Sequence, residues 1–296
     1  MEMTDAMAHP WRQRLRLYGR LIRIERPIGV LLLLWPTLTA LWFAAHGWPG
    51  WKLLAIFVAG TWLMRAAGCA VNDVADRRFD AHVKRTAQRV VATGQVSARE
   101  ALAVAAALAA AAASLLIWLN PAARLTALAA VAVAAGYPYF KRFFALPQAM
   151  LGIAFSFGIP MTFAAVQARL SPVAVWMTVG NFFWVIAYDT EYAMVDRDDD
   201  LRLGIHSSAI LFGRADVAVV AVCYAVYLVV MAALAFGERL GAGFAAGWAA
   251  AAACAVYHVA LIRQRQREAC FRAFQHNHWL GLAIFAGTVA DFALSH

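Results

Sequence analysis

Two groups of acidic residues, far apart in the chain, repeat at helical spacing at the ends of long apolar stretches. The first lies in NDVADRRFD and the second in YDTEYAMVDRDDD. Steps of three, four or seven residues keep side chains on one helix face, so each group gathers its oxygen atoms along one face. The first group is Asn72, Asp73, Asp76 and Asp80, and the second is Asp189, Tyr192, Asp196 and Asp200.

Carboxylates crowded in this way repel one another unless cations lie between them. Two like unit charges about 4 Å apart cost roughly 4 kcal/mol at an effective dielectric constant of about 20. Mg²⁺ is bound by one or two carboxylates together with water and substrate phosphates, and it stabilises a departing diphosphate. The spacing therefore indicates Mg²⁺ and a polyphosphate ligand. Ion pairing with nearby arginines is the alternative interpretation, and Asp198 and Asp199, which fall on another face, are expected to be solvated.

Basic residues in two further places suit an anionic ligand. Tyr137 and Lys141 lie four residues apart in YPYFKR, and Arg142 follows, so these side chains could bind a phosphate or simply anchor a membrane helix. Arg65 lies within an apolar stretch, seven residues before Asn72. A charged side chain within a membrane is costly and normally faces a partner or a wet cavity, which predicts an anionic substrate group beside Arg65. Snorkelling to the surface, over about 10 Å, is the alternative.

The elements that must position these residues are membrane helices. The 296 residues are 63% hydrophobic and 15% charged, with a mean hydropathy of +0.63. Apolar runs of about 17–22 residues are typical of transmembrane helices, because a spanning helix satisfies its own backbone polar groups. The chain is therefore predicted to be an all-α integral membrane protein with nine transmembrane helices. The predicted spans are Ile28–Ala45, Lys52–Val71, Ala98–Leu119, Leu125–Phe140, Pro147–Val166, Pro172–Tyr188, Val217–Phe236, Ala242–Ile262 and His278–Leu294.

The distribution of positive charge predicts the orientation. Of 26 Lys and Arg residues, 21 fall in the connections on one side of the nine predicted spans and 4 on the other. Cytoplasmic connections are enriched in Lys and Arg, so the N-terminus and both acidic groups are predicted to be cytoplasmic. The net charge of +9 is then a matter of topology, not nucleic-acid binding.

The chain is predicted to divide into an N-terminal segment, residues 1–26, and one membrane domain, residues 27–296. Apolar residues alternate with arginines in the first segment, which favours an amphipathic helix on the cytoplasmic leaflet over a mitochondrial presequence. Four scattered cysteines show neither a disulfide pattern nor zinc-ligand spacing.

Several strings resemble a known family. NDVADRRFDAHVKRT, YPYFKR, YDTEYAMVDRDDD and SSAILFG resemble the UbiA-type intramembrane prenyltransferases. ERPIGVLLLLWPTLTALW and QREACFRAF resemble the bacterial 4-hydroxybenzoate branch, and the resemblance extends over essentially the whole chain. It implies helices around a central cavity in the inner membrane. It also implies Mg²⁺-dependent transfer of a polyprenyl group from polyprenyl diphosphate to the ring carbon meta to the carboxylate of 4-hydroxybenzoate, in ubiquinone biosynthesis.

The resemblance also implies roles for individual residues. Metal and diphosphate binding would fall to Asn72, Asp76 and Asp80 in the first motif and to Asp196 and Asp200 in the second, with Asp196 a candidate base for the phenol. The diphosphate-binding Y-x-x-x-K motif would be Tyr137 and Lys141. Arg65 and Arg142 would hold either diphosphate or the acceptor carboxylate, and the sequence leaves that choice open. In one departure from the family pattern, residues 89–94 lack its two prolines.

Two kinds of alternative function remain at this point. Other members of the family use the acceptors of menaquinone, haem O or chlorophyll-type products. An ion-coupled membrane transporter would also carry intramembrane acids, but transporters place them near the midplane on broken helices. Here both acidic groups lie at the predicted cytoplasmic rim, which favours the enzyme.

Overall fold

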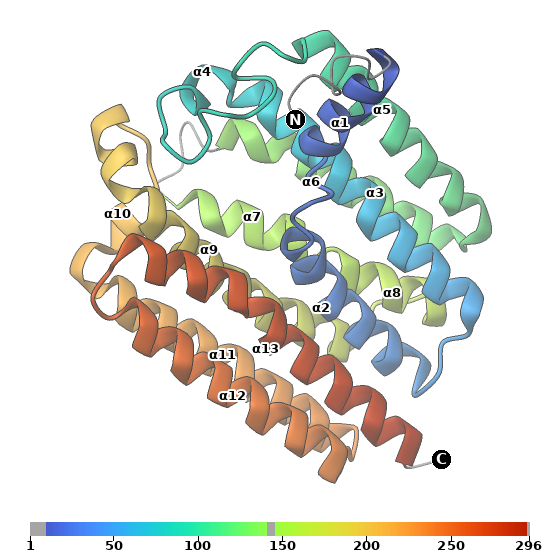
Figure 1. Ribbon diagram of the computed structural model, residues 1–296. Helices are drawn as coiled ribbons and strands as arrows, with labels where there is room; N and C mark the ends of the chain where they lie inside the picture. The colour runs from blue at the N-terminus through green and yellow to red at the C-terminus, as the bar shows by residue number, and fades with distance from the viewer. Residues whose placement is uncertain (1–9, 141–145, 295–296) are drawn as a thin grey trace, which may run out of the picture.

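The computed structural model describes residues 10–140 and 146–294. Within these ranges every regular element is a helix and no strand is present, as predicted (Figure 1). Short helices and 3₁₀ turns punctuate the bundle: α4 (Arg77–Asp80), α10 (Ser208–Phe212), η1 (Leu116–Trp118) and η2 (Gly213–Ala215). The longer helices are α1 (Pro10–Leu21), α2 (Ile28–Ala45), α3 (Trp51–Ala75), α5 (Ala98–Leu115), α6 (Pro121–Phe140), α7 (Pro147–Ser156), α8 (Gly158–Gln167), α9 (Pro172–Leu203), α11 (Asp216–Gly237), α12 (Ala242–Ile262) and α13 (Arg267–Leu294).

Six helical segments of the described chain are long and apolar enough to cross a membrane. They contain α2, α3, α5, the pair α7–α8, α11 and α12, and the apolar part of α6, residues Pro121–Gly136, is shorter. The predicted spans Pro172–Tyr188 and His278–Leu294 lie within α9 and α13, but both helices extend further, to Leu203 and back to Arg267. Helical structure continues through these charged turns because their side chains find ion-pair partners, as described below.

Local sequence explains where several helices begin and end. Ser97 caps α5 by accepting a hydrogen bond from the backbone N–H of Glu100, which is a capping-box spacing. Ser171 caps α9 in the same way, with Pro172 in the first turn, where its missing N–H costs no hydrogen bond. At the other end of α9, Gly204 has φ 66°, a left-handed conformation that suits glycine and stops the helix. These signals fix the length of the helix that carries the second acidic group.

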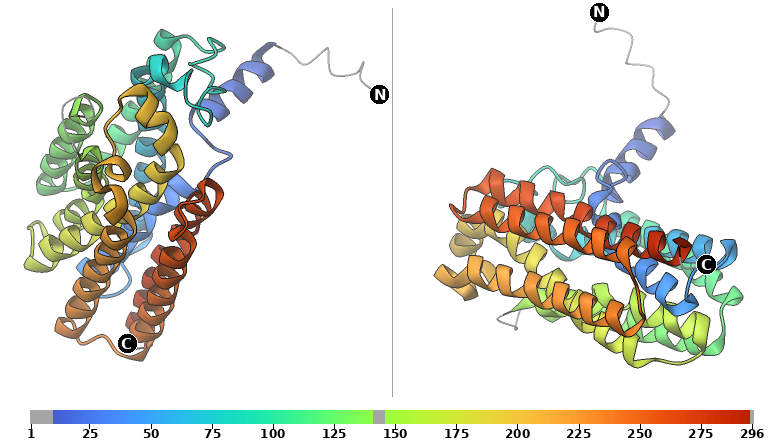
Figure 2. Two further views of the ribbon diagram at one scale, coloured as in Figure 1. Left: turned by 90° about the vertical axis from the view of Figure 1, so that its left-hand side faces the viewer. Right: turned by 90° about the horizontal axis from the view of Figure 1, so that it is seen from below.

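The long helices pack side by side, with α9 in contact with α11 and α13, and α2 in contact with α13 and α8 (Figures 1 and 2). The closest packing joins α12 to α13, where Gly247 faces Gly287. A Cβ added to Gly247 would lie 2.4 Å from the backbone oxygen of Ala283, so only glycine permits this approach. The main apolar core includes the fully buried side chains of Trp184, Phe43 and Phe163.

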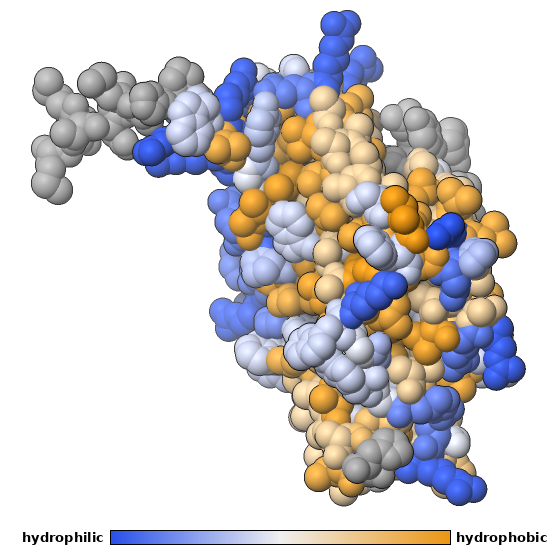
Figure 3. Space-filling view, turned by 90° about the vertical axis from the view of Figure 1, so that its right-hand side faces the viewer, coloured by the Kyte–Doolittle hydropathy of each residue, from blue (hydrophilic) through white to orange (hydrophobic). Residues whose placement is uncertain are grey.

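The outer surface carries many large apolar side chains. Phe236 and Val229 on α11 and Leu125 and Leu128 on α6 are all well exposed. Figure 3 shows hydrophobic side chains across the centre of one face. A surface of this kind needs lipid as its solvent, so the chain is a multi-pass membrane protein.

The predicted N-terminal helix is present as α1, but much of its apolar face packs against protein. Leu21 is completely buried in a small core with Val90 and Val96. Tyr18 donates a hydrogen bond to Glu100 over 2.5 Å. Trp11, by contrast, stays exposed. Helix α1 thus braces the segment between α4 and α5, which contributes to the site below.

Candidate active site

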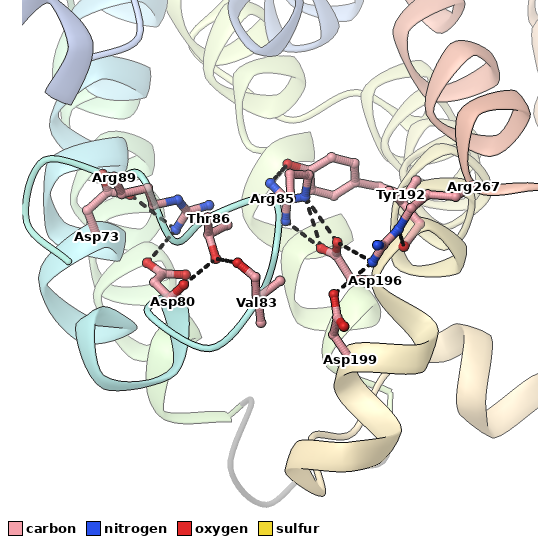
Figure 4. Close-up of polar contacts among 11 residues, drawn as sticks. Asp73, Asp80, Val83, Arg85, Thr86, Arg89, Tyr192, Asp196, Asp199 and Arg267 are labelled. Atoms are coloured by element: carbon pink, nitrogen blue, oxygen red, sulfur yellow. Dashed lines mark hydrogen bonds and ion pairs between the residues drawn. The ribbon is translucent and has the colours of Figure 1, made fainter. Parts of the chain in front are cut away.

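Three pieces of chain bring the two acidic groups together. The first group lies at the end of α3 and in α4, and the second at the end of α9. The segment 81–97, between α4 and α5, reaches from the first group to the second (Figure 4). Arg85, only five residues after Asp80, pairs with Asp196 of α9. The segment that follows the first group thus contacts the second group, and the prediction that both groups share one metal and diphosphate site stays a prediction.

In the first group, arginines bind the buried carboxylates. Asp73 is only 2% exposed, and its Oδ1 lies 2.6 Å from Arg23 Nη2 and 3.2 Å from Arg89 Nη1. Arg89 Nη1 also lies 2.7 Å from Oδ2 of Asp80. Burial raises the pKa of Asp80 above its ordinary value, although the Arg89 guanidinium opposes that shift. Asp73 and Asp80 thus converge on a single guanidinium.

In the second group, Arg85 donates hydrogen bonds to Asp196 from two nitrogens. Its Nε lies 3.2 and 3.0 Å from the two carboxylate oxygens, and its Nη2 lies 2.5 Å from Oδ2. The guanidinium also stacks 4.3 Å from the ring centre of Tyr192 and donates to the Tyr192 hydroxyl. Burial would lower the pKa of Arg85, but Tyr192, Asp196 and Asp80 outweigh it, so the pKa lies above its usual range. Arg85 is firmly charged.

The end of α9 also corrects one prediction. Asp199 is not solvated, as predicted, but buried, with Oδ2 2.7 Å from Arg267 Nη2 at the start of α13. This hydrogen bond lowers the pKa of Asp199 below its usual value. Asp198 is exposed, as predicted. Asp200 is half-buried, and burial, followed by repulsion from Asp196, raises its pKa to about 7. Sequence spacing could not show that a helix start 68 residues away supplies a partner for Asp199.

The residues fit a divalent cation by their chemistry, but their carboxylates are engaged by arginines. Among the residues that the structure describes, no three His, Cys, Asp or Glu side chains are arranged as a metal site. Mg²⁺ binds hard oxygen ligands, and the carboxylates of Asp73, Asp80 and Asp196 are ligands of that kind. Asn72, Asp76 and Asp189 add further oxygens from half-buried positions on the same elements. The donor set therefore suits Mg²⁺, whereas its present counter-ions are guanidinium groups.

Arg65 lies half-buried in α3 and contacts α2 as well as its own helix. Its Nε donates to the backbone oxygen of Gly29 over 3.3 Å, and its Nη1 contacts Sγ of Cys69. A Cβ added to Gly29 would lie 2.4 Å from Arg65 Nη2, so this approach depends on glycine. The predicted anionic substrate partner of Arg65 stays a prediction.

The predicted Y-x-x-x-K motif falls at the edge of what is described. Tyr137 lies in the last part of α6, but its side chain, together with all of Lys141 and Arg142, lies outside the described residues. Their predicted contact with diphosphate therefore remains a prediction.

Sequence analysis gave ion pairing with nearby arginines only as the alternative interpretation, and the structure shows that pairing for Asp73, Asp80 and Asp196. Arg23, Arg85, Arg89 and Arg267 entered that reasoning only as evidence of topology. One signal was available for two of them, because Arg85 and Arg89 are four residues apart and closely follow Asp80. Nothing local indicates that Arg23 and Arg267 reach the site from opposite ends of the chain.

Comparison with known proteins agrees with this geometry. Residues 33–281 match the model of the UbiA prenyltransferase family. The chain is 58% identical to the 4-hydroxybenzoate octaprenyltransferase of Cupriavidus necator, over 95% of this chain and 99% of that protein. The same enzyme from Herminiimonas arsenicoxydans is also 58% identical, with the same coverage.

Solved structures give the same result for the fold. The apo structure of a UbiA homolog from Aeropyrum pernix K1 superposes with a TM-score of 0.77 at 25% identity, over 89% of this chain and 97% of that one. A UbiA homolog from Archaeoglobus fulgidus bound to GPP and Mg²⁺ gives a TM-score of 0.69 at 16% identity, over 93% and 99%. The chain belongs to the UbiA prenyltransferase family.

Proposed function

We propose that this protein transfers a polyprenyl group from polyprenyl diphosphate to 4-hydroxybenzoate, at the ring carbon meta to the carboxylate, in ubiquinone biosynthesis. The observation that carries the proposal is the pairing of Arg85 with Asp196, which brings the segment that follows the first acidic group into contact with the second. Near-full-length relatives named 4-hydroxybenzoate octaprenyltransferase support the choice of acceptor.

The donor diphosphate would bind between the two groups. Mg²⁺, when bound, would neutralise the diphosphate and favour its departure. Arg85 and Arg89 could pair with phosphate oxygens as they now pair with carboxylates, and Tyr137, Lys141 and Arg142 would add contacts from the end of α6. The proposed metal ligands are Asn72, Asp73, Asp76, Asp80, Asp189, Asp196 and Asp200. The structure of a UbiA homolog from Archaeoglobus fulgidus bound to GPP and Mg²⁺ supports the use of a divalent cation.

An apolar groove beside the first group suits the isoprenoid chain. Its volume is about 240 Å³, and its lining includes Pro27 and Leu31 of the α2 region and Trp62 and Ala66 of α3. Arg23, which pairs with Asp73, lies at the same groove. A prenyl diphosphate could therefore place its headgroup at the acidic groups and its first isoprene units in the groove, with the remainder in lipid.

The transfer would be an electrophilic aromatic substitution. The bond between the allylic carbon and the diphosphate oxygen breaks, and the ring carbon ortho to the phenol hydroxyl forms the new C–C bond. The proton on that carbon then passes to the released diphosphate or to water, which restores the aromatic ring. Asp196 would accept the phenol proton or polarise that hydroxyl, and Arg65 or Arg142 would bind the acceptor carboxylate. Tyr192 packs 4.3 Å from Phe274, between ring centres, and such apolar walls would exclude water from an allylic cation.

The orientation belongs to the same proposal. Nine spans in the inner membrane, with α6, α9 and α13 added to the six apolar segments, would place the N-terminus and the site at the cytoplasmic side. Residues 1–26 would form the cytoplasmic segment and 27–296 the prenyltransferase domain.

A direct test is to incubate purified protein with 4-hydroxybenzoate, a polyprenyl diphosphate and Mg²⁺, and to identify products by mass. Prenylated 4-hydroxybenzoate and free diphosphate are expected in detergent, where no ion gradient exists, and this result would exclude a transporter. Product formed only from a naphthoate or haem acceptor would instead assign another branch of the family.

A further inference from the structure

Arg85 binds the second acidic group more completely than a surface arginine would. Asp196 is 8% exposed and the side chain of Arg85 19% exposed, so little water screens the pair. The guanidinium lies against Asp196 on one edge and over the Tyr192 ring on its face. Two parallel hydrogen bonds of this kind are the strong form of an arginine–carboxylate pair.

This pairing leaves Asp196 poorly able to bind a metal. Both of its oxygens accept hydrogen bonds from Arg85, and Arg267 Nη2 lies 4.0 Å from Oδ1. A divalent cation on either oxygen would also lie within a few ångströms of the guanidinium charge, where like charges repel strongly. Displacement of Arg85 into water alone would leave Asp196 nearly buried with only the longer ion pair to Arg267, at 4.0 Å, which is costly. The guanidinium therefore needs another anion before it can leave.

A diphosphate is the anion that fits. Arginine pairs with phosphate in the same forked geometry as with carboxylate. The chain next to Arg85 is fastened to the first group, since Thr86 Oγ1 donates to the backbone oxygen of Asp80 over 3.0 Å and Arg89 pairs with Asp80. Arg85 thus lies between the two groups, where a ligand bound between them would meet its guanidinium (Figure 4).

We propose that Arg85 is an internal counter-ion that keeps divalent cations from Asp196 until a diphosphate accepts its guanidinium. Cation binding at the second acidic group then follows donor binding and does not precede it. This inference rests on the proposed function only in taking a diphosphate as the ligand between the groups.

The test measures Mn²⁺ binding to the full-length protein in detergent, by the EPR signal of free Mn²⁺, with no donor or acceptor present. Arg85→Gln should bind Mn²⁺ about 10-fold more tightly than the wild type, which corresponds to about 1.4 kcal/mol. Arg78→Gln is the matched control, because Arg78 lies in the neighbouring helix turn, is exposed and loses the same charge. It should bind Mn²⁺ as the wild type does.

Asp196→Asn locates the effect. In the wild type without diphosphate this substitution should leave Mn²⁺ binding unchanged, because Arg85 already occupies the carboxylate. In the Arg85→Gln background it should abolish the gain. Addition of inorganic diphosphate to the wild type should create a Mn²⁺ site that is lost with Asp196→Asn. A protein-free blank corrects for Mn²⁺–diphosphate complexes in solution.

Two results would overturn the inference. One is Arg85→Gln binding Mn²⁺ no more tightly than Arg78→Gln, and the other is wild-type protein losing a donor-free Mn²⁺ site with Asp196→Asn. If Arg85→Gln does not fold, the comparison of Asp196→Asn with the wild type still tests the inference. The Mn²⁺-binding measurements use no acceptor, so they do not depend on the prenylation assay. A failure to prenylate 4-hydroxybenzoate would refute the proposed function without deciding whether Arg85 keeps cations from Asp196.

Discussion

Helix α9 carries carboxyl groups into two very different surroundings within about one and a half turns. At Asp196 the partners are charged guanidinium groups from a loop and from the start of α13. At Glu191, which is completely buried, the partners are neutral groups of two other helices, α11 and α13. We call the second set the Glu191 cluster, and its members are Trp184, Glu191, Tyr224, His258, His276 and Asn277.

Hydrogen-bond counting indicates that the Glu191 cluster is neutral. The single Tyr224 hydroxyl lies 2.8 Å from Glu191 Oε1, 2.9 Å from Asn277 Oδ1 and 3.1 Å from His258 Nδ1. One hydroxyl hydrogen cannot serve three acceptors, so two neighbours must donate instead. A protonated Glu191 and an Nδ1–H tautomer of His258 satisfy every contact. Asn277 completes the cluster, donating to Glu191 Oε2 over 2.8 Å and accepting from Trp184 Nε1 over 2.9 Å.

We interpret the Glu191 cluster as a structural framework, and the ion-paired carboxylates as a site whose partners change when ligands bind. Neutral hydrogen bonds among α9, α11, α12 and α13 fix the position of α9 and have no reason to change in the reaction. The ion pairs of Asp196, Asp73 and Asp80 involve arginines from less regular chain, and we propose that cations and phosphate replace these arginines during the reaction. The contacts of the ion-paired carboxylates should therefore change when metal and donor bind. The contacts of the Glu191 cluster should change only when the packing of the helices is altered.

The largest expected effect is that of metal removal. EDTA should reduce prenyl transfer to background, because the diphosphate loses its divalent counter-ions. Unfolding temperature should change little, because arginines already compensate the carboxylates. Product mass and thermal unfolding in detergent measure the two effects, and excess Mg²⁺ is the control for recovery. Loss of folded structure in EDTA would show that the metal belongs to the framework.

The next largest effect is expected from Asp196→Asn. Loss of the carboxylate removes both a cation ligand and a proton acceptor, and the turnover rate should fall by about 10²–10⁴-fold. Asp198→Asn, two residues away and exposed, is the matched control and should retain wild-type turnover. Equal rates for the two variants would remove Asp196 from the site.

The Glu191 cluster should give a stability effect instead. Glu191→Ala removes one hydrogen-bond partner each from Tyr224 and Asn277, at a cost of about 1–3 kcal/mol for each buried group left short of a partner. Glu191→Gln, which keeps the shape and remains neutral, should stay within about 1 kcal/mol of the wild type. Chemical unfolding in detergent distinguishes them. A glutamine variant as unstable as the alanine variant would indicate that Glu191 is charged.

The smallest effect is expected at Gly29. The methyl group of Gly29→Ala would meet the Arg65 guanidinium, which can move aside because it ends a flexible side chain. We expect the acceptor KM to rise by about 3–10-fold, the equivalent of one weakened hydrogen bond, while kcat is retained. Gly68→Ala, where an added Cβ meets nothing within 4 Å, is the control. A rise in the donor KM alone would assign Arg65 to diphosphate.

The sequence predicted those features that depend on neighbouring residues. Hydropathy placed helices at Ile28–Ala45 and Ala242–Ile262 with the bounds observed, and four-residue spacing identified Asp80 and Asp196. Hydropathy ended the membrane span in α9 at Tyr188, whereas the helical spacing of the acidic residues indicated that the helix itself continues, as it does to Leu203. Neither signal shows a partner distant in sequence, so Asp199 looked solvated.

Partners distant in sequence could not be predicted. Glu191 and Asn277 are separated by 86 residues, and Arg85 and Asp196 by 111. A lone Glu in an apolar helix and an Arg in a basic loop carry no local sign of the other member of the pair. Both contacts follow from the packing of α9 against elements whose register is set by the whole bundle.

A structure with Mg²⁺ and a non-reactive prenyl diphosphate analogue bound tests the central claim most directly. The guanidinium of Arg85 should leave Asp196 and contact the diphosphate, while the hydrogen bonds of Glu191 remain unchanged. Arg85 still paired with Asp196 beside a bound cation and diphosphate would contradict the account.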